Sequence, residues 1–177
     1  MNVSRISLPE DMVREGFCTE NGHLKHSGDP CRLECVSIPD GIRSVDSRCF
    51  ADSPLLKKVC IPDSVRELGV GAFAGCRGLE EVTLPEGIDR IRKELFLNCG
   101  SLREITIPGT VTAIGEWAFR GCGKLGDVRI PDSVTEICAE VFVDCPEVVI
   151  CAEEHSFAHA FAQQFGLAFR EMPSVDS

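Results

Sequence analysis

The chain has no tyrosine and a single tryptophan, Trp117, among its 177 residues. Tyrosine and tryptophan contribute much of the binding energy of many protein interfaces. This chain therefore has few residues of the type that usually anchors a protein partner. Positive charge is also scarce: 18 lysines and arginines stand against 28 aspartates and glutamates, a net charge of −10. Because phosphate binding needs a basic field, this balance argues against nucleic acid and against an anionic membrane surface as partners.

Long apolar runs are missing as well, and no stretch approaches the roughly 20 residues that span a bilayer. The first residues, MNVSRISLPEDMVREGF, contain acids at Glu10, Asp11 and Glu15 and no uninterrupted apolar segment. They do not resemble a signal peptide. We therefore expect no membrane insertion, and either a cytoplasmic protein or one whose leader is not part of this sequence.

Cysteine, by contrast, is abundant. There are 11 cysteines, an odd number, so they cannot all pair within the chain. Such a density in a small secreted protein would suggest a disulfide framework. The positions of the cysteines in the repeat described next favour a different interpretation.

From Val36 to Ile150 the sequence repeats at one constant interval, the distance from Val36 to Val59, without insertion or deletion. A fixed period of 20–29 residues with an L-x-x-[VI]-x-[IL] junction is typical of leucine-rich solenoids, whose stacked repeats share one core. The five blocks read VSIPDGIRSVDSRCFADSPLLKK, VCIPDSVRELGVGAFAGCRGLEE, VTLPEGIDRIRKELFLNCGSLRE, ITIPGTVTAIGEWAFRGCGKLGD and VRIPDSVTEICAEVFVDCPEVVI.

Each block predicts one coil. Two apolar residues two apart, such as Val59 and Ile61, point to one side of a short strand. The proline that follows lacks an N–H donor and ends the strand. A short helical or 3-10 turn then directs one phenylalanine inward, and cysteine follows three residues later in four blocks. The phenylalanines are Phe50, Phe73, Phe96, Phe119 and Phe142, and the cysteines are Cys76, Cys99, Cys122 and Cys145.

The same repetition decides how the stretch IPDSVRELGVGAFAGC should be interpreted. Its Asp63, Ser64 and Cys76 could suggest a catalytic site, but a near copy, IPDSVTEICAEVFVDC, begins three periods downstream at Ile130. We therefore assign these residues to turns and core, and expect no enzyme and no cofactor. Neighbouring column cysteines would point in parallel rather than at one another, and burial makes thiols inert. Reduced core thiols are the expectation.

These columns resemble the BspA-type leucine-rich repeats, whose blocks read roughly IP-x-S-V-T-x-I-G-x-x-A-F-x-x-C-x-x-L-x-x-V. The resemblance implies an α/β solenoid, a right-handed superhelix with a parallel sheet on one face and short helical or 3-10 turns on the other. It also implies binding of proteins or host surfaces, often by secreted or surface-displayed bacterial and protist proteins. It brings no catalytic residues.

A stack of coils needs both ends covered, so we divide the chain into 1–35, 36–150 and 151–177. Asn21-Gly22 predicts a type I′ hairpin in the N-terminal cap. In the C-terminal cap Phe157, Phe161 and Phe165 predict one apolar helix face, with Ser156 as N-cap and Gly166 as the stop.

Two groups of residues are candidates for metal sites. Cys18, His23, His26, Cys31 and Cys35 are zinc-type ligands, but their spacing matches no standard finger and the hairpin places Cys18 and His23 opposite His26. His155 and His159 stand four apart without the context of a metalloprotease helix. We expect caps without a metal in both places.

Binding is expected on the exposed sheet positions, with another protein as partner. Arg103 and Arg129 are the best contact candidates because arginine is enriched in hot spots. The alternative is a structural spacer or a fragment of a larger surface protein, with little affinity of its own. The candidate residues are Lys57, Lys58, Glu80, Glu81, Thr83, Arg103, Glu104, Thr106, Asp127 and Arg129.

Overall fold

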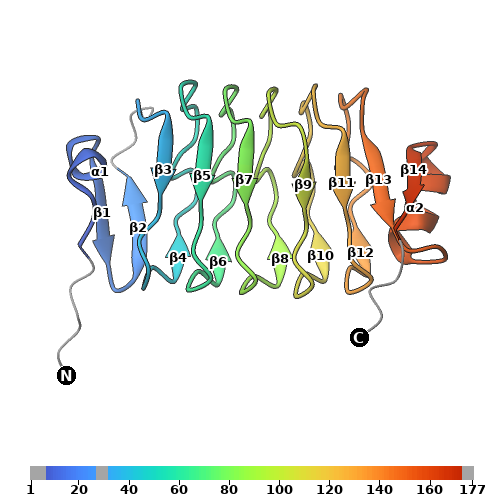
Figure 1. Cartoon of the computed structure of the whole chain (residues 1–177), viewed down its shortest axis with the longest axis horizontal. Coiled ribbons are helices and arrows are strands. Elements are labelled where there is room, and N and C mark those ends of the chain that lie inside the picture. The colour runs from blue at the N-terminus through green and yellow to red at the C-terminus, as the bar shows by residue number, and fades with distance from the viewer. Residues whose placement is uncertain (1–6, 27–31, 173–177) are drawn as a thin grey trace.

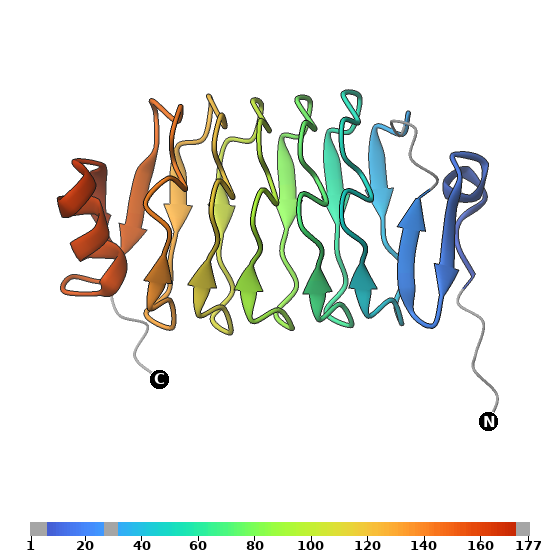
Figure 2. The same cartoon turned by 180° about the vertical axis from the view of Figure 1, so that it is seen from behind.

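The computed structural model describes residues 7–26 and 32–172, and it is a solenoid of stacked coils (Figures 1 and 2). Parallel strands run down one side of the stack, and we call their outward surface the long face. Neighbouring strands pair one period apart, as Val36 with Val59. The strands of the long face are β3 (Cys35–Ser37), β5 (Lys58–Cys60), β7 (Glu81–Thr83), β9 (Ile105–Thr106), β11 (Asp127–Arg129), β13 (Val149–Ala152) and β14 (Ala168–Glu171).

The single sheet expected on this face is divided into two hydrogen-bonded groups, β3-β5-β7 and β9-β11-β13-β14. A second row of parallel strands, which the sequence did not predict, lies behind the first (Figure 2). Its outward surface is called the short face. The strands of the short face are β4 (Ser44–Val45), β6 (Glu67–Leu68), β8 (Arg90–Ile91), β10 (Ala113–Ile114) and β12 (Glu136–Ile137).

The predicted internal row of phenylalanines is present. The rings of Phe50, Phe73, Phe96, Phe119 and Phe142 stack with centroids 5.3 to 5.7 Å apart and planes within 12° of parallel. The first four of these side chains are fully buried. Because each ring packs on its own copies in the adjacent coils, one coil alone could not bury this column.

The segment that carries each phenylalanine is a series of turns, and the expected helical or 3-10 conformation is wrong: none of residues 35–149 is helical. The N–H of Ala51 bonds within its own coil to Arg48, whereas the N–H of Phe50 bonds across to Ala72 in the next coil. Arg48 and Asp52 have positive φ angles of 57° and 56°. Backbone N–H groups therefore find carbonyl partners alternately within their own coil and in the next coil. A helix would direct these N–H groups only to its own carbonyls and leave the next coil without these hydrogen bonds.

The fifth coil is one residue shorter than the fixed period predicts. Ile105 pairs with Val128 at the full period, but Val128 pairs with Ile150, which comes one position too early. The position occupied in earlier coils by Lys57 and its equivalents is therefore missing before β13. The chain then turns into the C-terminal cap.

The N-terminal end is covered by helix α1 (Glu10–Arg14) and by the hairpin of β1 (Phe17–Glu20) and β2 (His23–His26). Asn21 and Gly22 at the turn have positive φ angles of 52° and 83°. Strand β2 pairs with β4, which joins the hairpin to the short-face strands. Phe17 packs against Phe50 and extends the phenylalanine row outward.

At the other end, helix α2 (Phe157–Phe165) connects β13 to β14. The Ser156 hydroxyl accepts from the N–H of His159, and Gly166 follows the helix in the left-handed conformation. Phe161 packs on Phe142, but Phe157 and Phe165 are 45% and 41% exposed. Of the three phenylalanines expected to form one apolar helix face, only Phe161 is therefore buried. Ala158 and Ala162 fill the inner face instead.

The tight approach of neighbouring coils predicts that Gly69→Ala destabilises the fold. A Cβ at Gly69 would lie 2.3 Å from the backbone nitrogen of Ser47, so the backbone must shift. We expect a loss of about 1–3 kcal/mol in the free energy of unfolding, measured by urea denaturation. Gly109→Ala is the matched control, since nothing lies within 4 Å of its Cβ position. Equal denaturation midpoints for the two variants would contradict the close approach.

Candidate functional site

The long face presents the outward residues of its strands, two per coil. In β5, Lys58 and Cys60 are exposed while Val59 between them is buried. The same alternation places Glu81 and Thr83 outward on β7. Further along the face the outward candidates are Thr106, Asp127 and Arg129.

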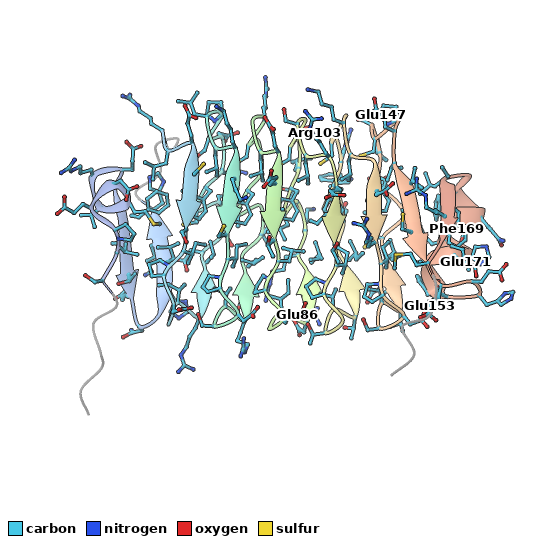
Figure 3. All side chains as sticks on the ribbon, viewed as in Figure 1. Glu86, Arg103, Glu147, Glu153, Phe169 and Glu171 are labelled. Atoms are coloured by element: carbon cyan, nitrogen blue, oxygen red, sulfur yellow. The ribbon has the colours of Figure 1, made fainter. Side chains whose placement is uncertain are left out.

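Four of the candidate residues lie outside the strands. Lys57, Glu80 and Arg103 occupy equivalent positions just before the strands begin, at one rim of the long face. Figure 3 shows Arg103 at this rim. Glu104 directly precedes β9 and is exposed. The structure therefore divides the predicted site into strand positions and a rim, and separates Arg103 from the centre of the face.

Opposite charges on neighbouring coils pair across the long face. Lys58 Nζ lies 2.7 Å from Glu81 Oε2, and this hydrogen bond raises the lysine pKa and lowers the glutamate pKa. Both side chains are exposed, so such pairs add little to stability. The other pairs across this face join Lys57 to Glu34, Arg129 to Glu104 and Arg170 to Asp127.

Arg103 differs from the other cations of the candidate set. Within the described residues it has no ion-pair partner, whereas Lys57, Lys58 and Arg129 each have one. An unpaired, exposed guanidinium keeps its five donors available to a partner.

The cysteine column is a hydrogen-bonded part of the core. The thiol of Cys99 donates to the carbonyl oxygen of Phe73 in the preceding coil, 3.2 Å away. Cys76, Cys122 and Cys145 repeat this contact with Phe50, Phe96 and Phe119. Each thiol thus caps a buried carbonyl, a role that sequence reasoning missed because it treated cysteine only as a small apolar residue.

Burial raises the pKa of these thiols. The pKa of Cys145 rises to about 11, and those of Cys99 and Cys122 also rise, in each case mainly because the thiolate would lose its hydration. A thiol held neutral in this way is a poor nucleophile. Cys18, Cys35 and Cys60, in contrast, are exposed.

The five candidate zinc ligands do not converge. His23 and Cys18 lie on one side of the hairpin, while the His26 ring stacks on Phe17 and its Nε2 lies 2.7 Å from the Glu15 carbonyl oxygen. Cys31 lies outside the described residues. Among the residues that are described, no three histidine, cysteine or acidic side chains form a group that could hold a metal.

His155 and His159 are close in space, with ring centroids 6.1 Å apart. Both nitrogens of His159 are already engaged: Nδ1 accepts the N–H of His155 at 2.9 Å, and Nε2 lies 2.9 Å from the side-chain amide of Gln163. His159 also stacks on Phe169. The ring therefore supports the start of α2 rather than offering a ligand atom.

One group with catalytic residue types was missed from the sequence, because it forms only when the hairpin packs on the first coil. Ser44 Oγ lies 2.6 Å from Nδ1 of His23, and Asp46 Oδ1 lies 3.7 Å from the same nitrogen. A serine–histidine–aspartate relay needs two different ring nitrogens, one for each partner. This arrangement does not provide them.

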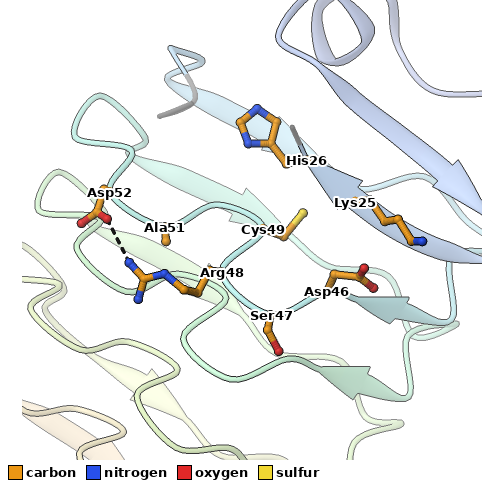
Figure 4. A pocket seen from close by; sticks show the side chains of 8 residues that line it. All are labelled: Lys25, His26, Asp46, Ser47, Arg48, Cys49, Ala51 and Asp52. Carbon is orange, nitrogen blue, oxygen red and sulfur yellow. Dashed lines mark hydrogen bonds and ion pairs between the residues drawn. The ribbon is translucent and has the colours of Figure 1, made fainter. Parts of the chain in front are cut away.

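The hollow in Figure 4 has a volume of about 560 Å³ and lies beside this group. Its walls carry both signs of charge, and Arg48 and Asp52 pair with each other across it at 3.0 Å. Cys49 points its thiol at the carbonyl of Leu24. No apolar lining with a few convergent polar groups, the usual form of a small-molecule site, is built here.

Trp117 lies beside the short face rather than on the long one. Its backbone has a positive φ of 57°, and its ring is half-buried. Lys93 Nζ lies 4.6 Å from the ring centroid, the Arg120 guanidinium lies 5.5 Å away, and the indole N–H donates to Glu140. These contacts satisfy the tryptophan within the molecule.

Comparison with known proteins now identifies the repeat. The model of the BspA type leucine rich repeat region matches residues 28–149 in six copies. The chain belongs to the BspA-type leucine-rich repeat family. The match begins ahead of the first block that the sequence delimited, at Val36.

Solved structures of leucine-rich repeat proteins are similar to this BspA-type chain. A leucine rich cell surface protein from Faecalibacterium prausnitzii is 29% identical over 80% of this chain and 38% of its own, with a TM-score of 0.72. The T. pallidum leucine rich repeat protein is 30% identical over 82% of this chain and 71% of its own, with a TM-score of 0.69.

The pneumococcal vaccine antigen PcpA shares the fold, with a TM-score of 0.66 at 19% identity over 90% of this chain and 48% of its own. The BspA-type chain thus spans well under two thirds of the F. prausnitzii relative. No curated protein matches it at a significant level. In the described residues, no helix has the length and apolar character to cross a membrane.

The buried thiols predict that stability falls as pH rises above about 9. An unfolded cysteine ionises near its ordinary pKa of 9.0, whereas folded Cys145 ionises near 11. Between these values the unfolded chain binds fewer protons, so the free energy of unfolding decreases by up to about 1.4 kcal/mol per pH unit for each such thiol.

Urea unfolding between about pH 8 and pH 10 measures this slope. We expect Cys122→Ala to have a shallower slope than the unsubstituted protein, and Gly109→Ala, which leaves every thiol in place, to keep the original slope. Parallel slopes for all three proteins would show that the column thiols do not set the alkaline dependence.

Proposed function

We propose that this BspA-type chain is a non-enzymatic module that binds another protein through its long face. The supporting observation is a contrast between columns of the repeat. Inward columns keep one residue type from coil to coil, as the phenylalanines and cysteines do, because each must pack on its own copy. Outward columns hold several residue types along the stack, as in the series Cys35, Lys58, Glu81, Glu104 and Asp127 and the series Ser37, Cys60, Thr83, Thr106 and Arg129.

The fold places few demands on the outward side chains, so they are free to vary. A recognition surface requires this freedom, because its side chains must match a partner. The two arginines favoured from the sequence, Arg103 and Arg129, occupy neighbouring coils, one at the rim and one on β11. Arg129 lies 3.6 Å from Glu104, so its charge is only partly neutralised there. We place the centre of the binding site between these coils.

The described relative from F. prausnitzii is a cell surface protein. By that likeness we extend the proposal to a role at a cell surface, in place of the cytoplasmic location that the sequence favoured. The alternative function remains a spacer, and one observation favours it: cross-coil ion pairs occupy most of the long-face cations. A partner would have to compete with these pairs.

Charge reversal separates the two functions. We expect Arg103→Glu with Arg129→Glu to reduce captured partner proteins at least about tenfold, because two guanidinium contacts become repulsive. The measurement is affinity capture from an extract of the source cells, quantified by mass spectrometry. Arg90→Glu with Arg92→Glu makes the same change of charge on the short face and is the matched control. Capture that survives both double substitutions equally would exclude the long face.

A further inference from the structure

Two exposed thiols share one part of the long face. Cys35 on β3 and Cys60 on β5 both point outward, and pairing in register places Cys35 beside Lys58 and Cys60 beside Ser37. On its other side Cys60 is beside Thr83 of β7. The thiol of Cys60 therefore lies between two hydroxyl-bearing neighbours, while Lys58 stands between the two cysteines.

Lys58 is the register neighbour of Cys35 and lies two residues from Cys60 on the same outward face. Its ammonium group lies 2.7 Å from Glu81 Oε2, and this hydrogen bond is the main cause of the rise in the lysine pKa. A positive charge next to an accessible thiol favours the thiolate, which is the nucleophilic form. No other part of the described chain brings two exposed cysteines to one lysine.

The two thiols are nevertheless badly placed to pair with each other. Because Cys35 is opposite Lys58 and Cys60 is two residues further along, the cysteines are diagonal neighbours on the sheet. Diagonal neighbours stand about 7–8 Å apart, whereas a disulfide needs Cβ atoms at about 3.5–4.5 Å. An intramolecular disulfide would require the backbone to move, so each thiol is left to react with an outside group.

We propose that Cys35 and Cys60 form a modification site that takes up low-molecular-weight disulfides, with Lys58 as the positioning residue for both thiolates. The thiolate sulfur attacks one sulfur of the small disulfide and forms a new S–S bond, while the old S–S bond breaks. The cysteine sulfur is oxidised, the second half of the small disulfide leaves as a thiolate, and the proton of the original thiol passes to water.

The remaining cysteines differ from Cys35 and Cys60 in burial or in their neighbours. The column thiols donate to main-chain carbonyls and are buried, so they react only when the coils open. Cys18 is exposed but lies on the hairpin opposite Lys25, away from Lys58. It therefore serves as an internal control whose local charge does not depend on Lys58.

Oxidised glutathione added to the whole chain tests the proposal, with intact mass and peptide mapping as readouts. We expect adducts on Cys35 and Cys60 to form at least about 100-fold faster than on the column cysteines. Lys58→Met should slow both adducts about threefold or more, without changing the rate at Cys18. Lys58→Arg should restore the rates, and Lys124→Met, which removes an exposed lysine elsewhere, should leave them unchanged.

Three results would overturn the site. One is modification of Cys35 and Cys60 no faster than that of the column thiols. Another is equal slowing at Cys18 in Lys58→Met, or no slowing at all. The third is a loss of two mass units from a Cys35–Cys60 disulfide instead of adducts. None of these measurements needs a protein partner, so their failure is separate from failure of the proposed binding function.

Discussion

Stacking of each coil on its own copy is the constraint on which the rest of the molecule depends. Parallel strands stand about 4.8 Å apart, so every residue lies next to its equivalents in the coils on either side. A column must therefore complement itself. Phenylalanine rings do so by stacking, cysteine thiols do so by reaching the carbonyl of the coil before, and the charged column at the rim of the long face does so by changing sign, as Glu34 and Lys57 show.

The departure at the third coil shows how local this requirement is. The hydroxyls of Ser64, Thr110 and Ser133 each donate to a carbonyl of the preceding coil at 2.8–2.9 Å. The third coil has Gly87 at this position, and the Arg66 guanidinium takes over the carbonyl of Val65 at 3.3 Å. The short-face ladder is interrupted at the same coils, between β6 and β8. At this coil a missing hydroxyl and a broken ladder occur together, whereas the first coil has Gly41 at the same position and keeps the pairing of β2 with β4. Phe73 and Phe96 continue to stack beneath the break.

The columns could be predicted from the sequence because they repeat in it, and the phenylalanine row is the best example. Features without repetition could not. Two-residue strands such as β6 carry too few residues for a periodic signal, and exposure of Phe157 and Phe165 depends on how α2 packs over the last coil. The shortened fifth coil could not be predicted because Val148 keeps the expected spacing from Leu125. The missing position comes after Val148, before β13. The contact of His23 with Ser44 joins a cap to a coil, so no regular spacing of residues in the sequence predicts it.

The same stacking constraint separates the two populations of cysteine. A thiol in the inward column is fixed by the coil before it, and its proton is committed to a carbonyl, so the residue type repeats and the chemistry is suppressed. A thiol in an outward column has no such commitment: Cys60 stands where the other four blocks have serine, threonine or arginine. Its presence there is not required by stacking. Reactive thiols in this molecule are therefore expected at positions where the residue type does not repeat. On the long face these are also the positions where a partner would bind.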